Sequence, residues 1–349
     1  MIDNLDSMDP RTFTQLVYEL RNNGKFHDHT VPYTPGNLMA EITSNLAINE
    51  NSKVAVMYTV EWALYLKHIL NVKDITIIGG EFCRSTEICC NLWGFKYILG
   101  RKIGNDMKFD AIVGNPPFQK EDNKAKRWTL WEEFIKESLT LSDNVAMIVP
   151  QSFTGPNKVF NQVKKNISLL NVDVDKHFSV GSTFCYFVLD KTQEFNTTKI
   201  ISADGEFDID MRNLSFLPKE VNAYTLSLIN TLASRTRREW RRGELHTSDE
   251  RKFDDNGMYD VIHTNAQTKK TNIIHPNKDK IRVVITLSGY PTFKVIENAY
   301  CSQACMWTEF ENRALAEQFA AECNGEAVQE LMNVFKWSGW NSKEVIEML

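Results

Sequence analysis

Short apolar runs alternate with helical stretches through the first half of the chain, and this alternation constrains the fold more than any other feature. The runs are KVAVMY (53–58), ITIIG (75–79), FKYIL (95–99), FDAIVG (109–114) and NVAMIVP (144–150). Strands separated by helices of about ten residues are typical of βαβ units and a parallel sheet. Two later runs, LLNVDVDKHF (169–178) and FCYFVLD (184–190), predict an antiparallel end to that sheet. We therefore predict an α/β fold with a mostly parallel sheet.

The alternation stops near residue 195, where the strands become irregular and an arginine-dense segment follows. This change predicts three parts. Residues 1–24 hold an N-terminal helix, because their apolar spacing is helical and Gly24 closes it. Residues 25–200 form the α/β domain, and residues 201–349 form a mixed α+β region that ends in helices.

Composition describes an ordinary globular chain, with 42% hydrophobic residues, 24% charged residues and a net charge of −5. No apolar run reaches the roughly 18 residues of a membrane span, and the acidic N-terminus lacks the order of a secretory signal. We expect a cytoplasmic protein that does not enter a membrane. The seven cysteines lack paired C-x-x-C spacing, which favours thiols in a reducing compartment and predicts no metal site.

The segment Asn115, Pro116, Pro117 and Phe118 follows the strand at 109–114, where open α/β sheets bind their ligands. The prolines stiffen the loop and remove two N–H donors. The side-chain oxygen of Asn115 and the carbonyl of Pro116 can then accept two hydrogen bonds from one –NH2 group. Phe118 can stack on a base that has been flipped out of a duplex. The segment therefore predicts a site for an exocyclic base amine, and a rigid strand-to-helix turn is the alternative.

The sequence around this segment resembles the amino-methylating DNA methyltransferases of the Eco57I and TaqI kind. The likeness covers about residues 30–195 and is carried by FDAIVGNPPFQ, WTLWEEFIKESL, NVAMIVPQSF and HFSVGSTFCYFVLDK. It implies a Rossmann-like methyltransferase fold followed by a target-recognition region. It also implies methyl transfer from S-adenosylmethionine to N6 of a flipped adenine in double-stranded DNA, as in restriction-modification. Asn115 to Phe118 then match the catalytic tetrapeptide, and Phe178 matches a second aromatic residue that stacks on the base.

The resemblance also implies positions for the cofactor S-adenosylmethionine. Tyr33, Thr34 and Pro35 resemble the segment that closes over its methionine end. Glu81 resembles the acid that binds its ribose hydroxyls, and Asp106 is a displaced replacement for the acid near its adenine.

The turn after the first strand departs from this family. An acid usually closes that strand and glycines follow, because the backbone must approach the cofactor closely. Here Val56 or Met57 stands in place of the acid, and the turn YTVEW has no glycine. Glu61 either substitutes for the acid or begins the next helix.

Three interpretations therefore remain open. The chain is a divergent adenine methyltransferase, a catalytically silent DNA-recognition subunit that works with an active partner, or an enzyme that modifies a base in another way. Large side chains filling the cofactor pocket, among them Met57, Tyr58 and Trp62, would favour the silent homologue.

A basic segment after the α/β domain predicts contact with DNA. Its residues, together with two lysines further on, are Arg235, Arg237, Arg238, Arg241, Arg242, Lys269 and Lys270. Such clusters neutralise phosphates, and an arginine can read guanine in the major groove. Lys278, Lys280 and Arg282 extend the predicted face. A solvated helix face is the alternative.

Overall fold

The computed structural model divides into two compact units, Met1–Asn213 and Leu214–Leu349. It describes residues 9, 11, 12, 15, 33–79, 90, 91, 93–99, 107–118, 130–178, 182–233, 237–246, 253–265, 267–336 and 341–349. The predicted helix in residues 1–24 lies almost wholly outside these. The predicted boundary at residue 200 falls within a strand of the first unit, Thr198–Ser202, so the sheet continues past it.

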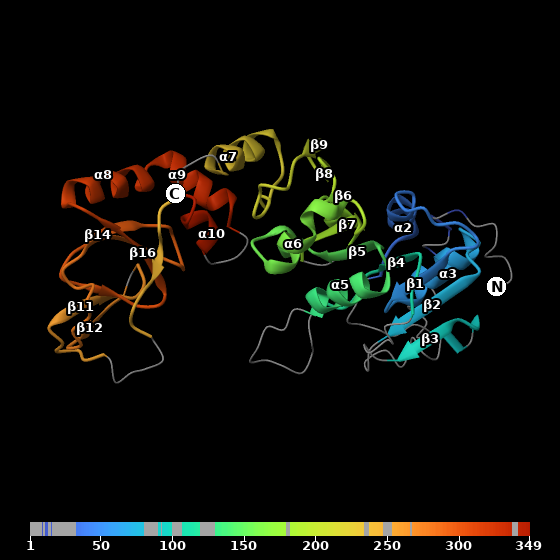
Figure 1. Ribbon diagram of the computed structural model, residues 1–349, viewed down its shortest axis with the longest axis horizontal. Coiled ribbons are helices and arrows are strands. Elements are labelled where there is room, and N and C mark those ends of the chain that lie inside the picture. The colour runs from blue at the N-terminus through green and yellow to red at the C-terminus, as the bar shows by residue number, and fades with distance from the viewer. Residues whose placement is uncertain are drawn as a thin grey trace. The chain divides into compact units, whose positions relative to one another are not determined.

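The first unit contains one large sheet, whose described part has nine strands (Figure 1). In spatial order they are β3 (Lys96–Leu99), β2 (Asp74–Gly79), β1 (Lys53–Met57), β4 (Ala111–Gly114), β5 (Asn144–Pro150), β7 (Phe184–Asp190), β6 (Ile167–Asn171), β8 (Thr198–Ser202) and β9 (Gly205–Ile209). Strands β1 to β5 are parallel, and β7 runs antiparallel to both β5 and β6. The predicted α/β fold, with its mostly parallel sheet and antiparallel end, is confirmed.

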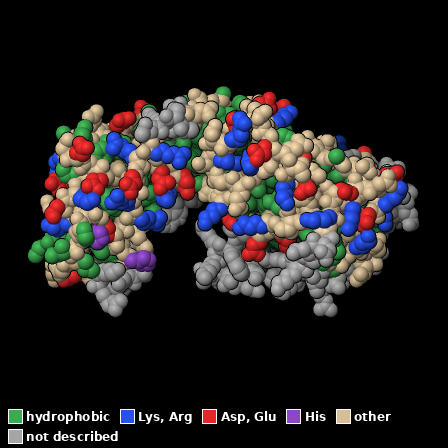
Figure 2. Space-filling view, in the orientation of Figure 1, with side chains coloured by type: hydrophobic (Ala, Val, Ile, Leu, Met, Phe, Trp, Pro, Cys, Tyr) green, Lys and Arg blue, Asp and Glu red, His purple; other side chains and the backbone are tan. Residues whose placement is uncertain are grey.

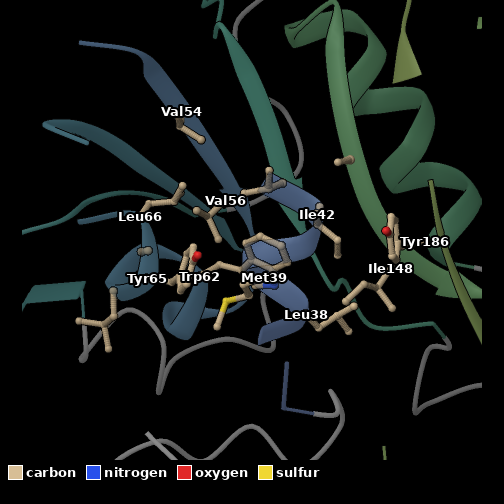
Figure 3. Close-up of a cluster of buried hydrophobic side chains, with 14 of the residues drawn as sticks. Leu38, Met39, Ile42, Val54, Val56, Trp62, Tyr65, Leu66, Ile148 and Tyr186 are labelled. Carbon is tan, nitrogen blue, oxygen red and sulfur yellow. The ribbon is translucent and has the colours of Figure 1, made fainter. Parts of the chain in front are cut away.

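Helices cover both faces of this sheet. On one face α2 (Gly36–Thr43) and α3 (Val60–His68) pack on the apolar side chains of β1, in a cluster that reaches Tyr186 (Figure 3). Successive strand residues point to opposite faces, so Phe187 faces the other way. There it stacks on Phe153, which contacts Trp131 of α5 (Leu130–Leu141).

The shorter helices of the first unit connect these elements. The α-helix α6 (Lys158–Val163) lies on the α5 side, because its Phe160 contacts Phe153. Among the described residues of this unit, the 3-10 helices are η2 (Gln151–Thr154), η3 (Lys164–Asn166) and η4 (Asp175–His177).

The second unit is a mixed α+β structure with two small sheets. One contains β10 (Arg241–Arg242), β16 (Cys305–Phe310), β13 (Ile281–Thr286) and β14 (Phe293–Ile296), and the other β12 (Thr268–Thr271), β11 (Tyr259–Ile262) and β15 (Tyr300–Cys301). Its helices are α7 (Ala223–Ala233), α8 (Arg313–Asn324), α9 (Glu326–Val334) and α10 (Lys343–Ile346). Helix α8 packs on β13, β14 and β16.

A buried ion pair stands in the core of the second unit. The Nη1 atom of Arg282 donates to Oε1 of Glu244 at 2.5 Å, and the two side chains are 0% and 4% exposed. The Nη2 atom of Arg282 donates to the carbonyl of Ala299, and the guanidinium lies over the ring of Trp307 at 5.0 Å. Arg282 is therefore a core residue, and its predicted place on the DNA-binding face is wrong.

No helix among the described residues is long and apolar enough to cross a bilayer. Cys185, Cys301 and Cys305 are buried free thiols, and burial raises the pKa of Cys305 to about 12. Within the described residues, no group of three His, Cys, Asp or Glu side chains is placed to hold a metal ion.

Replacing Glu244 with Ala should destabilise the second unit strongly, because the guanidinium of Arg282 stays buried without its carboxylate. We expect the free energy of unfolding to fall by about 3–5 kcal/mol, the usual cost of breaking a buried pair. Denaturant titration of the full-length protein, followed by circular dichroism and tryptophan fluorescence, measures this loss.

The matched control is Glu309→Ala, on β16 next to the strand that holds Arg282. It removes the carboxylate of the Lys280–Glu309 pair, whose side chains are 33% and 46% exposed. An exposed pair contributes less than about 1 kcal/mol. Equal losses from the two variants would contradict the role given to the buried pair.

Candidate functional site

The site lies where the sheet order reverses direction, between β1 and β4. Both strands are parallel to their neighbours, so their carboxyl ends meet at one edge, the usual ligand position in open α/β sheets. Met57 and Gly114 are register partners there. A Cβ atom on Gly114 would lie 2.6 Å from the carbonyl oxygen of Met57. Strands β1 and β4 are therefore too close at this point for a side chain on residue 114. The predicted tetrapeptide begins at the next residue.

The side chain of Asn115 is fully buried at this edge and contacts a second predicted segment. Its Nδ2 atom donates to Oγ1 of Thr34 at 3.3 Å, across 81 residues of sequence, and both residues are 0% exposed. The structure thus brings the Tyr33–Pro35 segment and the tetrapeptide together. Pro116 and Pro117 are also buried. Because the amide of Asn115 is buried in this conformation, a base could reach it only after neighbouring residues move aside.

An aromatic cluster stands beside the tetrapeptide. The ring centroids of Phe118 and Phe184 are 5.3 Å apart, and those of Phe178 and Phe184 are 4.9 Å apart. Phe118 and Phe178 are partly exposed, whereas Phe184 is buried between them. The two residues predicted to stack on a base therefore belong to one cluster.

Asp175 holds two members of this cluster in place. Its carbonyl accepts the N–H of Phe178 at 2.9 Å, and its carboxylate accepts the N–H of Phe184 at 2.5 Å. Sequence reasoning missed both Phe184 and Asp175. Phe184 lies within the run HFSVGSTFCYFVLDK, which carries part of the family resemblance. The sequence therefore contained a clue to its place beside the site.

The turn between β1 and α3 contains only Tyr58 and Thr59. The N–H of Thr59 donates to the carbonyl of Met57 at 3.1 Å, and Tyr58 between them has φ 78°, which is a γ-turn. Positive φ is rare for a bulky residue and costs on the order of 1–3 kcal/mol. Tyr58 is only 2% exposed, and its ring meets the edge of Phe134 at 5.4 Å. An aromatic residue thus occupies a backbone conformation that favours glycine.

The first turn of α3 is buried as well. Trp62 is 0% exposed and packs with Met39 and Val56, as Figure 3 shows. Glu61 is buried within this turn, where it belongs to the helix and does not close the strand. The helix-start interpretation of Glu61 is therefore favoured.

These residues do not fit the methionine end of S-adenosylmethionine. The family's cofactor needs close backbone approach at small residues after the first strand, whereas this turn is short, aromatic and buried. At the end of β2, a Cβ atom on Gly79 would collide with the hydroxyl group of Tyr97, so that ring lies over the strand end. Glu81 and Asp106 lie outside the described residues, and their cofactor roles stay predictions.

The predicted DNA-binding arginines lie in the second unit, with Arg235 outside the described residues. Arg237, Arg238, Arg241 and Arg242 are exposed. Arg238 stacks over Phe310 and Phe319 at 4.7 and 4.8 Å, and Nε of Arg241 donates to Glu239 at 3.0 Å. As neighbours on β10, Arg241 and Arg242 point to opposite faces of the sheet. These two arginines therefore do not share one face of the sheet.

Lys269 and Lys270 lie on β12, in the other small sheet. Lys269 stands over the ring of Phe253 at 4.5 Å, and Lys270 is exposed. Over the face of this unit seen in Figure 2, basic and acidic side chains are intermingled. The predicted DNA contacts of these lysines and arginines stay predictions.

Comparison with known proteins gives one family match. The model of the Eco57I restriction-modification methylase matches residues 37–179. Among curated protein sequences, none is significantly similar to this chain.

Solved structures with a similar fold include two restriction-modification proteins. A type I restriction-modification methyltransferase subunit from Streptococcus thermophilus is 12% identical, over 67% of this chain and 60% of that one, with a TM-score of 0.42. The type IIG restriction endonuclease BpuSI is 10% identical, over 96% of this chain and 60% of that one, with a TM-score of 0.42. The chain thus spans about three fifths of the length of each of these two structures.

The family match covers β1 to β5, the tetrapeptide and the segment that ends just after Phe178. Residues 37–179 of this chain are therefore similar to the Eco57I restriction-modification methylase family.

Proposed function

We propose that this protein binds double-stranded DNA and holds the exocyclic amine of one base, N6 of adenine in the first instance, at Asn115. The observation that supports it most strongly is the placement of Asn115 at the β1–β4 edge beside the cluster of Phe118, Phe184 and Phe178. A polar acceptor next to partly exposed aromatic rings suits a flipped base, which is both planar and a hydrogen-bond donor.

The tetrapeptide supplies the chemistry of this recognition. An exocyclic amine has two N–H groups, and the side-chain oxygen of Asn115 and the carbonyl oxygen of Pro116 accept them. Thr34 faces the Nδ2 end of the Asn115 amide, which directs its oxygen away from Thr34. Stacking on an aromatic side chain contributes about 1–3 kcal/mol per base, which is enough to offset the few kcal/mol that extrusion costs.

The β1–α3 turn favours base recognition without methyl transfer. Met57, Tyr58 and Trp62 are all buried there, and the backbone offers no glycine for a cofactor to approach. In this role the protein is a silent homologue that recognises DNA, and an active partner subunit would supply any catalysis.

Adenine N6 methylation is the second candidate, and the contact between Thr34 and Asn115 favours it. The resemblance gives the Tyr33–Pro35 segment to the methionine end of S-adenosylmethionine, and this segment lies directly against the tetrapeptide. A methyltransferase built this way must hold its cofactor by residues other than the β1–α3 turn. Asn115 and Phe118 keep the same roles in both candidates.

Asn115→Ala should lower the discrimination for the amine about 2–13-fold, because it removes one of the two acceptors and leaves the carbonyl of Pro116. We compare binding of single-stranded oligonucleotides that carry adenine with the same oligonucleotides carrying purine, which lacks the 6-amino group. Two neutral hydrogen bonds, at about 0.5–1.5 kcal/mol each, predict that the unmodified protein prefers adenine about 5–150-fold. Fluorescence anisotropy measures both affinities.

The control for this experiment is Asn196→Ala, in an exposed loop of the same unit. It should leave the preference for adenine intact. An undiminished preference in Asn115→Ala would contradict the assignment of the amine site.

Methyl transfer from tritiated S-adenosylmethionine to double-stranded DNA separates the two candidates. We expect no incorporation above that of a heat-denatured sample, because the β1–α3 turn is closed. Incorporation that disappears in Asn115→Ala would replace the recognition role with adenine methylation. Incorporation that persists in Asn115→Ala would exclude this site as its origin.

A further inference from the structure

We propose that Glu41 is a positioning residue for the amine site, because it anchors α2 to β6 and β7 and so sets how Thr34 meets Asn115. This inference rests on the proposed binding of a base amine at Asn115. The side-chain hydrogen bonds of Glu41 go to Asn171 and Tyr186 and not to the tetrapeptide. Its effect on the position of Asn115 therefore passes through α2.

The carboxylate of Glu41 joins three elements of the fold. Its Oε1 atom accepts hydrogen bonds from Nδ2 of Asn171 at 2.8 Å and from the hydroxyl group of Tyr186 at 2.7 Å. Asn171 ends β6 and Tyr186 lies on β7, where the two residues are register partners, and both are buried. Hydrogen bonds to an ionised acceptor are about twice as strong as neutral ones. One charged oxygen therefore fixes a helix to a cross-strand pair.

Tyr186 remains a hydrogen-bond donor under ordinary conditions. Burial raises the pKa of its phenol, and the hydrogen bond to Glu41 raises it further. Figure 3 shows Tyr186 beside Ile148 and Ile42, so the polar contact stands next to the apolar packing of α2. The contact is therefore directional within an otherwise apolar interface.

Apolar packing alone does not fix the position of α2. The helix has only eight residues, and its N-cap residue is Pro35, whose side chain makes no capping hydrogen bond. Helices this short are marginal by themselves, and the apolar contacts of Leu38, Met39 and Ile42 are non-directional. The hydrogen bonds of Glu41 supply the directional restraint.

A small movement of α2 would reach Asn115. Thr34 stands two residues before the first residue of α2, and the N–H of Met39 donates to the carbonyl of Pro35 at 3.0 Å. The Tyr33–Pro35 segment therefore moves together with α2. The Asn115–Thr34 hydrogen bond is 3.3 Å long, beyond the usual 2.7–3.2 Å of N–H···O bonds. A shift of a few tenths of an ångström is enough to break it.

The test compares Glu41→Ala with Glu41→Gln. The Gln variant keeps an oxygen that accepts from both Asn171 and Tyr186, whereas the Ala variant removes it. The readout is the preference for adenine over purine oligonucleotides, together with the thermal unfolding temperature. We expect Glu41→Ala to reduce the preference at least threefold, towards no preference, and Glu41→Gln to restore most of it. Glu50→Ala, an exposed carboxylate paired with Lys73, is the control and should leave the preference unchanged.

Each outcome decides a different claim. An unchanged preference in Glu41→Ala overturns the positioning role, even if the unfolding temperature falls. A preference missing from the unmodified protein overturns the proposed function, and this inference with it. If Glu41→Ala does not fold, Tyr186→Phe replaces it, because this variant removes one of the two donors. A full preference in Tyr186→Phe then overturns the positioning role, and a reduced one supports it.

Discussion

The close approach of β1 and β4 at Met57 and Gly114 is the constraint on which the rest of the site depends. No side chain fits between the two strands at that point, since a Cβ atom on Gly114 would lie 2.6 Å from the Met57 carbonyl. The chain therefore leaves the sheet edge in two ways. After β4 it presents the buried amide of Asn115, and after β1 it turns at once through Tyr58 into α3. In the proposed role, the first exit holds the base amine, and the second leaves no open turn for a cofactor.

The closed turn is a stable part of the core. Tyr58 costs on the order of 1–3 kcal/mol through its backbone conformation. Burying a large apolar side chain contributes about 1.5–3 kcal/mol, and both Tyr58 and Trp62 are buried beside this turn. The packing of the aromatic side chains thus offsets the strain of the turn. Opening it for a ligand would expose both rings, and this is why the same geometry that stabilises the domain opposes binding of S-adenosylmethionine.

Sequence patterns predicted the central sheet because its strands are apolar and alternate with helices at regular intervals. The contact between Thr34 and Asn115 was not predicted, because the residues are 81 positions apart and the family resemblance gave their segments separate roles. Strands β8 and β9 were missed as parts of the sheet. Unlike the central strands they are not continuously buried, since β8 alternates between more and less buried residues and β9 has no buried residue, and β8 joins the sheet through its pairing with β6.

Arg282 shows the limit of reading charge from sequence. Within DKIRVV, Arg282 resembles its partly exposed neighbour Lys280, but Glu244, 38 residues away, neutralises it inside the core. The positive φ of Tyr58 was equally hidden, because nothing in the sequence distinguishes a strained tyrosine from an ordinary one. The absence of glycine from the turn was visible, and it correctly indicated that the turn differs from that of the family.

The most direct test of the account is calorimetric titration of the full-length protein with S-adenosylmethionine. The closed β1–α3 turn predicts no saturable heat up to about 1 mM cofactor, which corresponds to binding no stronger than about −4 kcal/mol. A saturable heat with a dissociation constant near 1 μM, about −8 kcal/mol, would contradict it. That result would mean that the domain accommodates the cofactor despite Tyr58 and Trp62.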